Sequence, residues 1–118
     1  MTVLILGASL NPDRYSNMAL NDLLDYGFDV IAVGNRGGIV RGVEISRDVP
    51  SEAKIDTVTL YLRPSNQISY YTYLKDLKPR RVIFNPGTEN DELEKALAAI
   101  GIEVLEACTL VMLRTHQF

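Results

Sequence analysis

Short apolar runs alternate with amphipathic stretches along this chain, a pattern typical of α/β proteins. Residues 2–6 are almost entirely apolar, as expected of a strand that is buried on both faces of a parallel sheet. Residues 57–62 are rich in β-branched and aromatic side chains and indicate another strand. The same reasoning predicts three further strands, at residues 29–33, 81–84 and 102–105.

Helical periodicity fills the segments between these strands. The first helix is predicted to begin at Ser16 or Asn17 and to end at Gly27, which can adopt a left-handed conformation. A second helix is predicted from Pro64, which suits the first turn, to about Leu77. The buried face of the first helix is expected to consist of Leu20, Leu23 and Leu24.

The third predicted helix starts after Thr88 or Asn90, because either side chain can cap the free amides of the first turn. Asp91 and Glu92 suit the positive end of the helix dipole, and Gly101 ends the helix. We expect its core face to consist of Leu93, Leu97 and Ile100.

Three remaining segments have less regular patterns. The piece that follows the second strand contains Gly37, Gly38 and Gly42 and is predicted to be irregular. Residues 78–81, KPRR, are interpreted as a solvated turn. Residues 111–113 are interpreted as a short edge strand or a helical turn.

Five strands that alternate with helices predict right-handed crossovers and a parallel sheet covered on both faces. The expected fold class is therefore α/β, with a doubly wound parallel sheet in three layers, α/β/α. A chain of 118 residues fits one domain with one core, so residues 1–118 are assigned to one domain.

Composition narrows the functional classes. Twelve basic and fifteen acidic residues give a formal charge of −3, which argues against a broad nucleic-acid-binding surface but leaves room for a local anion site. No apolar run approaches the ~20 residues of a membrane span, and the first residues lack the basic region of a signal peptide, so we expect a cytoplasmic protein without membrane attachment.

Cys108 is the only cysteine, so we expect no intrachain disulfide and no metal site. His116 has no serine and acid beside it with which to form a catalytic triad.

The residues that suit ligand binding follow the predicted strands. Every loop after a strand of a parallel sheet lies at the same edge, where α/β proteins bind their ligands. Three of these loops each bring an arginine, namely Arg14, Arg36 and Arg63, and the others bring glycines and small hydroxyl residues. Three arginines at one edge of an acidic protein suit an elongated anion with several phosphates.

The chemistry of these loops limits the choice of ligand. Gly7 lets the first loop turn tightly, and Ser9 and the amides before the first helix can donate to a phosphate. NAD sites usually place an acid at the end of the second strand, whereas this chain has Asn35 and Arg36 there. Because arginine attracts a phosphorylated ribose, the candidates are NADP, with a 2′-phosphate, and coenzyme A, with a 3′-phosphate. The G-x-G-x-x-G spacing is not met, so the first loop is weak evidence for a nicotinamide cofactor.

Five segments occur in a characteristic order: GASLNPDRYS at 7–16, VGNRGG at 33–38, LYLRP at 60–64, NPGTEN at 85–90 and EACTLVML at 106–113. With these segments the chain resembles the small stand-alone CoA-binding domain proteins over nearly its whole length. Those proteins are similar to the N-terminal nucleotide-binding domain of the succinyl-CoA synthetase alpha subunit. The resemblance implies a Rossmann-like fold that binds coenzyme A or an acyl-CoA.

The resemblance also implies positions for the cofactor. It places phosphate contacts at the first loop, the adenosine end after the second strand, and the cleft wall at the later loops. Cys108 is interpreted either as a small packing residue or as a contact of the ligand's thiol end, including a mixed disulfide. The predicted cofactor-binding residues are Gly7, Ala8, Ser9, Arg14, Ser16, Asn35, Arg36, Arg63, Pro64, Asn85, Pro86, Gly87 and Cys108.

One departure from the resembling proteins limits what is transferred. Many of them have an acidic residue and a histidine a few positions after the cysteine, where this chain has Met112 and Leu113. No role of that pair is carried over, and no paired general acid and base is found elsewhere.

The function expected is therefore that of a non-catalytic CoA-binding module. Two alternatives remain open: a small NADP-dependent oxidoreductase, and an interaction module with a vestigial nucleotide site. Two kinds of partner also remain open, a second copy that binds through Tyr70 and Tyr73 and an acyl-CoA-metabolising protein.

Overall fold

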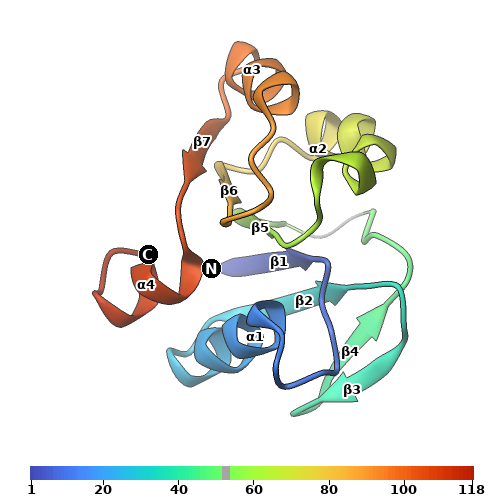
Figure 1. Cartoon of the computed structure of the whole chain (residues 1–118), viewed down its shortest axis with the longest axis vertical. Coiled ribbons are helices and arrows are strands. Elements are labelled where there is room, and N and C mark those ends of the chain that lie inside the picture. Colours follow the sequence, from blue (N-terminus) through green and yellow to red (C-terminus); the bar gives the residue numbers. More distant parts are fainter. Residues whose placement is uncertain (52–53) are drawn as a thin grey trace.

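A sheet covered by helices on both faces organises the molecule (Figure 1). The structure is a computed structural model that describes residues 1–51 and 54–118. Within them the strands are β1 (Thr2–Leu6), β2 (Asp29–Val33), β3 (Gly38–Val40), β4 (Val43–Ser46), β5 (Thr57–Leu60), β6 (Arg81–Phe84) and β7 (Glu103–Glu106). The helices are α1 (Tyr15–Asp25), α2 (Tyr71–Leu77), α3 (Asp91–Ala99) and α4 (Thr109–Arg114), and the short 3₁₀ turns η1 (Pro64–Asn66) and η2 (Ile68–Tyr70) precede α2.

The strand order across the sheet is β3-β4-β2-β1-β5-β6-β7. All neighbours pair in parallel except β3 and β4, which are antiparallel. The chain starts in the middle at β1, winds outward to β2 and β4, and then returns to wind outward again through β5, β6 and β7. This confirms the predicted doubly wound α/β fold.

Two apolar layers hold the helices on the sheet. Leu4 and Leu6 of β1 belong to the core under α2 and α3, while Val3 and Ile5 belong to the core under α1 and α4. These four side chains alternate between the two faces of the sheet and are all fully buried. This explains why the sequence of β1 is a continuous apolar run. Helix α1 packs against α4, and α2 packs against α3, so the three layers expected are present (Figure 1).

Several predicted elements agree closely with the structure. Strands β1, β2 and β6 have the predicted bounds, and Gly27 follows α1 with a φ of +85°. Asn90 caps α3, because its side-chain oxygen accepts from the Leu93 amide at 3.2 Å. Residues 111–113 lie in helix α4 and not in an edge strand.

The prediction of an irregular piece after β2 is wrong. Residues 38–46 form a hairpin, β3 and β4, with Val40 opposite Val43. The two residues between them, Arg41 and Gly42, have φ values of +51° and +84°, and such positive values match the twist of a two-residue hairpin loop. The guanidinium of Arg41 is held by the Asp25 carboxylate at 2.8 Å, which ties the hairpin to α1.

The predicted continuous helix from Pro64 to Leu77 is also wrong. Gln67 lies in the middle of this segment and is completely buried. Its side-chain amide donates to the carbonyls of Leu62 and Thr88, at 2.7 and 2.8 Å. Because this arrangement draws the side chain inward between two loops, the backbone forms two 3₁₀ turns and becomes α-helical only at Tyr71.

Three smaller expectations fail for local reasons. Ile100 is 42% exposed because it is the C-cap of α3, one residue beyond the last helical position. Strand β5 ends at Leu60, two residues earlier than predicted, where the chain enters a loop. Arg81 in the KPRR segment is buried, since the Phe118 ring covers its guanidinium at 4.3 Å. In the described part of the chain, no helix has the length and apolar character of a membrane span.

Candidate functional site

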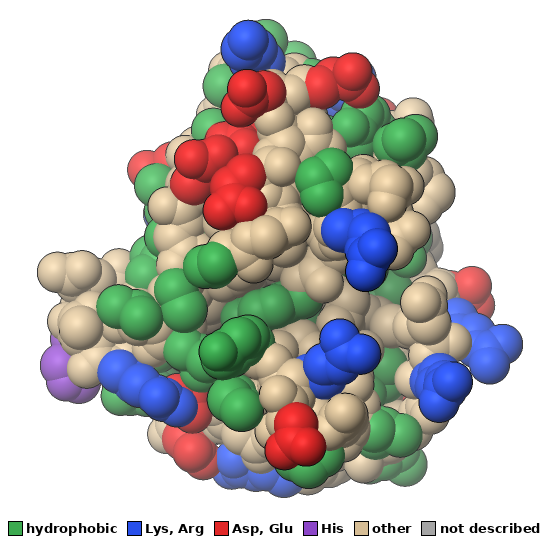
Figure 2. All heavy atoms as spheres, viewed as in Figure 1, with side chains coloured by type: hydrophobic (Ala, Val, Ile, Leu, Met, Phe, Trp, Pro, Cys, Tyr) green, Lys and Arg blue, Asp and Glu red, His purple; other side chains and the backbone are tan. Residues whose placement is uncertain are grey.

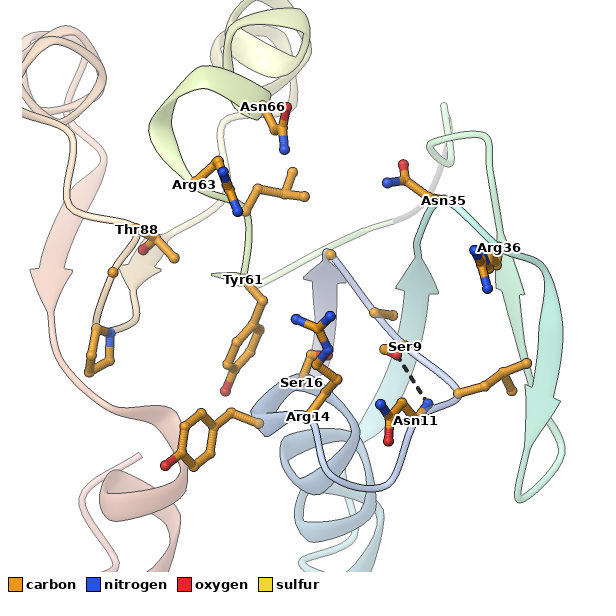
Figure 3. Close-up of a pocket in the computed structure, with 17 residues that line it drawn as sticks. Ser9, Asn11, Arg14, Ser16, Asn35, Arg36, Tyr61, Arg63, Asn66 and Thr88 are labelled. Carbon is orange, nitrogen blue, oxygen red and sulfur yellow. Dashed lines mark hydrogen bonds between the residues drawn. The ribbon is translucent and has the colours of Figure 1, made fainter.

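A cleft of about 810 Å³ opens at the carboxyl edge of the sheet. It crosses the ends of four neighbouring strands, in the order β2, β1, β5 and β6, so that four loops face one another across it (Figure 3). At a strand spacing of about 4.8 Å, these four ends span roughly 15 Å. The cleft is therefore long enough for an extended ligand.

The loop between β1 and α1 forms the floor of the cleft. Gly7 has a φ of +97°, and a Cβ there would lie 2.9 Å from the carbonyl oxygen of Tyr61, so glycine alone fits without a backbone shift. The amides of Gly7 and Ala8 both donate to the Val33 carbonyl at 2.9 Å. These contacts fix the loop against the ends of β2 and β5.

Ser9 lies in the same loop and retains a hydrogen-bond donor. Its Oγ accepts from the Asn11 amide at 3.0 Å, and its carbonyl accepts from Asn17 Nδ2 at 3.0 Å (Figure 3). A hydroxyl both donates and accepts, so the Ser9 proton can be given to a ligand oxygen. The bond that orders the side chain therefore leaves its donor function intact.

Gly34 sets the distance between the loops after β1 and β2. A Cβ at this position would collide with the Ala8 carbonyl oxygen. The Gly34 amide donates to the Ser46 carbonyl at 2.9 Å, which anchors the start of the second loop. Asn35 and Arg36 follow at once and are thereby held at the end of the cleft (Figure 3).

Helix α1 presents an uncapped N-terminus to the cleft. Arg14 occupies the N-cap position, its side chain makes no capping hydrogen bond, and the first turn contains no acid. The Arg14 carbonyl accepts from the Asn17 and Met18 amides. The backbone amides that precede Asn17 at the start of α1 have no partner inside the helix. Together with the positive end of the helix dipole, such amides favour a bound anion.

The cleft holds arginines that the protein does not neutralise. Arg14, Arg36 and Arg63 all line it and are exposed. Within residues 1–51 and 54–118, no ion pair is formed by any of them. Three other arginines each pair with an aspartate at 2.8 or 2.9 Å: Arg41 with Asp25, Arg80 with Asp56 and Arg114 with Asp22. Figure 2 shows basic side chains around the hollow in the middle of this face.

A buried polar network supports the other end of the cleft. Asn85 Nδ2 donates to Thr59 Oγ1 at 2.7 Å and to the Leu60 carbonyl at 2.8 Å, and Asn85 Oδ1 accepts from the Thr109 amide at 2.9 Å. The hydroxyls of Thr59 and Thr109 bond each other at 2.8 Å. The network joins β5, β6 and the start of α4, so the Pro86–Gly87 turn leaves the sheet at a fixed point.

Tyr61 stands between this network and the cleft. Its ring lines the cleft, while its hydroxyl is buried and makes no hydrogen bond within the described residues. Burial raises the pKa of Tyr61 to about 12, although the nearby hydroxyls of Thr109 and Thr59 act in the opposite direction. The phenol therefore stays neutral at physiological pH.

The structure brings ten of the thirteen predicted cofactor-binding residues into the lining of the cleft: Gly7, Ala8, Ser9, Arg14, Ser16, Asn35, Arg36, Arg63, Pro86 and Gly87. Pro64 is exposed outside the lining, and the Asn85 side chain is used inside the protein. Cys108 is the half-buried N-cap of α4 and also lies outside the lining.

Seven lining residues were not predicted: Leu10, Asn11, Tyr15, Tyr61, Leu62, Asn66 and Thr88. Tyr61 and Leu62 were assigned to the strand, and its early end is what exposes them to the cleft. Tyr15 was placed before the first helix rather than in it. All three residues lie next to a loop at the carboxyl edge of the sheet, and this position was the available signal.

Comparison with protein families and solved structures gives one family. The sequence model of a family described as a CoA binding domain matches residues 1–114. No curated protein matches the chain.

Solved structures with the same fold span most of the chain. An uncharacterized protein is 49% identical, covers 99% of this chain and 97% of its own, and superposes with a TM-score of 0.95. A Thermus thermophilus protein is 26% identical over 99% of this chain and 90% of its own, with a TM-score of 0.88. A dinucleotide-forming acetyl-coenzyme A synthetase from Ca. Korarchaeum cryptofilum shares the fold at 20% identity, over 90% of this chain and 25% of its own, with a TM-score of 0.71.

Proposed function

Because the chain belongs to the CoA-binding domain family, we propose that its cleft binds coenzyme A without catalysing a reaction. The observation that carries this proposal is the set of three exposed arginines along one cleft, none of them paired with an acid of the described chain. Coenzyme A has a diphosphate and a separate 3′-phosphate, so it supplies anionic groups at two points along an extended molecule. The spacing of the arginines over three strand ends suits such a ligand.

The diphosphate is proposed to sit at the start of α1. The uncapped helix end, the Ser9 hydroxyl and the Arg14 side chain converge there. Arg63 faces the same space from the loop after β5 (Figure 3). Backbone amides and guanidinium groups together form charge-assisted hydrogen bonds to phosphate oxygens.

The adenosine is proposed to lie at the β2 end. A smaller hollow of about 440 Å³ shares Asn35, Leu62 and Asn66 with the cleft. It adds Tyr70 and Ile68, and Ile68 is 65% exposed. These apolar side chains suit the face of an adenine ring, and Arg36, which follows Asn35 and lines the cleft, suits the 3′-phosphate.

The composition of the lining supports a non-catalytic role. Of the described residues, those that line the cleft include no aspartate, glutamate, histidine, cysteine or lysine. Burial raises the pKa of Tyr61 in the lining, so the phenol keeps its proton and is disfavoured as a base. The proposed activity is therefore binding and presentation of the cofactor.

Calorimetric titration with coenzyme A and 3′-dephospho-CoA tests this proposal. We expect coenzyme A to bind at least about tenfold more tightly, because one charge-assisted contact contributes about 1.5 kcal/mol or more. Arg36→Ala should remove this preference. Arg41→Ala is the matched control, since Arg41 is also exposed but bonds Asp25 outside the cleft.

Titration with NADP and NAD separates the proposal from the oxidoreductase alternative. Binding of NADP without binding of coenzyme A would contradict the proposal, although both ligands use an arginine at the β2 end. An unchanged preference for coenzyme A in Arg36→Ala would place the 3′-phosphate elsewhere. Absence of binding by all four ligands at millimolar concentration would refute nucleotide binding at this cleft.

A further inference from the structure

The two halves of the cleft differ in chemistry. The half over β2 and β1 contains Arg36, Asn35 and Arg14. The half over the ends of β5 and β6, beyond Arg63, is lined by residues without charge, namely Tyr61, Pro86, Gly87 and Thr88, and it is bordered by Tyr15 and Ser16 at the start of α1. A ligand that spans the cleft therefore has an anionic part and a part that is uncharged.

Part of the polar groups around the uncharged half is used within the protein. The Thr88 hydroxyl donates to the Asn85 carbonyl at 2.7 Å, and the Asn85 side chain makes three bonds to β5 and α4. The Tyr61 hydroxyl is buried, so the ring and not the polar tip faces the cleft. Toward the end of β6 this half consequently offers mainly the Tyr61 ring and Pro86 to a ligand, while the Tyr15 and Ser16 hydroxyls remain at its border.

Tyr15 is the most informative residue of this half. It is the first residue of α1, and 70% of its surface is exposed. The side chain makes no hydrogen bond within the described residues and belongs to neither core. A large aromatic side chain that lines a cleft and does not stabilise the fold is suited to contact a ligand.

Apolar surface continues from this half onto the neighbouring helix. Helix α4 packs against α1, and the Asp22–Arg114 ion pair at 2.9 Å holds the two together. Val111 on α4 is 57% exposed. In Figure 2 hydrophobic side chains gather over α4 and the start of α1, next to the basic side chains of the hollow.

The proposed orientation of the cofactor decides what reaches this surface. With the adenosine at the β2 end and the diphosphate at α1, the pantetheine arm extends past Arg63 toward the end of β6. Its sulfur then approaches Tyr15, Tyr61 and Pro86. A free thiol would leave these side chains largely in water, whereas an alkyl chain attached to the sulfur would cover them.

We propose that the ligand is an acyl-CoA thioester and that Tyr15, Tyr61 and Pro86 form the site for a short, apolar acyl group. This inference rests on the proposed binding of coenzyme A and adds the substrate class. The surface is open and not a deep cavity, which suits chains of about four to six carbons. Acyl groups that end in a carboxylate gain nothing, because the nearest cations, Arg14 and Arg63, are assigned to the diphosphate.

Titration with coenzyme A and with acetyl-, butyryl-, hexanoyl- and succinyl-CoA tests the inference. Full burial of one CH₂ tightens binding up to about fourfold, and partial burial about twofold. We therefore expect hexanoyl-CoA to bind about tenfold more tightly than acetyl-CoA. Succinyl-CoA should bind more weakly than butyryl-CoA.

Variants assign the effect to the proposed residues. Tyr15→Ser should reduce the gain from acetyl- to hexanoyl-CoA to about twofold or less. Because Tyr15 is exposed, we expect the variant to keep the melting temperature of the parent, which a melting curve checks. Tyr26→Ser is the matched control, because Tyr26 is an exposed tyrosine at the opposite end of α1, and it should retain the tenfold gain.

The outcomes distinguish this inference from the proposed function. Equal affinity for coenzyme A and hexanoyl-CoA, or tighter binding of succinyl- than butyryl-CoA, would overturn the acyl site while coenzyme A binding stands. A chain-length gain that survives Tyr15→Ser would overturn the assignment to Tyr15. Absence of binding by every one of these ligands would overturn the proposed function, and the acyl site with it.

Discussion

Tyr61 has its ring at the surface of the cleft and its hydroxyl inside the molecule. The hydroxyl lies near Thr59 and Thr109, but those two hydroxyls bond each other, and the Thr59 hydroxyl also accepts from Asn85 Nδ2. A buried polar group without a partner costs free energy, so the phenol is expected to weaken the fold slightly.

We predict that Tyr61→Phe keeps the fold and raises the free energy of unfolding by about 0.5–1 kcal/mol at pH 7. The difference from the parent should grow above pH 10. The unfolded chain loses the Tyr61 proton near pH 10 and the folded chain near pH 12, so the folded state binds more protons in this window and the parent loses stability as the pH rises. Urea unfolding of both proteins between pH 7 and 11 measures this.

Tyr26→Phe provides the control for removal of an exposed phenol at the far end of α1. It should follow the parent at every pH. A Tyr61→Phe protein that is less stable than the parent at pH 7 would show that the hydroxyl has a bonding partner and would contradict the prediction.

At the scale of elements, the central strands were predictable, and the hairpin and the connections were not or only in part. Strands β1 and β6 are buried on both faces, and hydrophobicity alone defines such strands. The β3–β4 hairpin was missed because its turn is Arg41–Gly42 and not the usual Asn-Gly, and because Arg41 is held in place by Asp25 of α1. The break before α2 depends on Gln67, whose partners lie 5 and 21 residues away.

The candidate site was predictable for a topological reason. Once strands and helices alternate, Arg14, Arg36 and Arg63 must reach the same edge, whatever the exact bounds of the elements. The roles of Asn85 and Cys108 were beyond such reasoning. Whether a side chain after a strand turns toward the cleft or into the protein depends on partners such as Thr59, which sequence order does not reveal.

Asn85 is expected to connect three elements, and its removal should show this. Asn85→Ala loses two side-chain donors and leaves the Thr109 amide and the Leu60 carbonyl without their partner. We predict a loss of about 2–4 kcal/mol and a melting temperature lower by roughly 8–15 °C. Thermal unfolding followed by circular dichroism measures the shift.

Asn66→Ala is the matched control, because Asn66 lines the cleft with an exposed side chain. It should change the melting temperature by no more than about 2 °C. A similarly small change for Asn85→Ala would mean that β6 and α4 hold their positions without the network.

At the scale of the whole molecule, charge is separated between two regions. Basic side chains surround the cleft, while acids gather on α3 and β7 (Figure 2). Asp91, Glu94 and Glu106 lie so close together that Glu94 raises the pKa of Glu106. The net charge of −3 is thus unevenly distributed, and the edge of the sheet at the cleft carries a concentration of positive charge.

The opposite edge of the sheet is closed by the segment after α4. The Phe118 ring covers the guanidinium of Arg81 at 4.3 Å and contacts the Phe28 ring at 5.1 Å. Arg81 Nε donates to Thr57 Oγ1 at 2.9 Å, but its Nη2 is buried without a partner in the described chain. Burial lowers the pKa of Arg81, and the Phe118 ring face offers the buried cation a favourable contact. This contact joins residues 37 positions apart, which is why KPRR was taken for a solvated turn.

We predict that Phe118→Ala destabilises the fold by about 2–3 kcal/mol and leaves the affinity for coenzyme A unchanged within about twofold. The ring contacts the starts of β2 and β6, whereas the cleft lies at the ends of the same strands, so the two regions share the sheet but no side chain. Thermal unfolding and calorimetric titration of one preparation measure both quantities, and Gln117→Ala, an exposed neighbour, should alter neither. A Phe118→Ala protein that melts like the parent but binds coenzyme A more weakly would contradict this prediction. It would mean that a change at the starts of the strands alters the cleft at their ends. If the variant loses stability and keeps its affinity, the Phe118 contact stabilises the edge at which the strands start. The edge that carries the cleft is then organised independently of it.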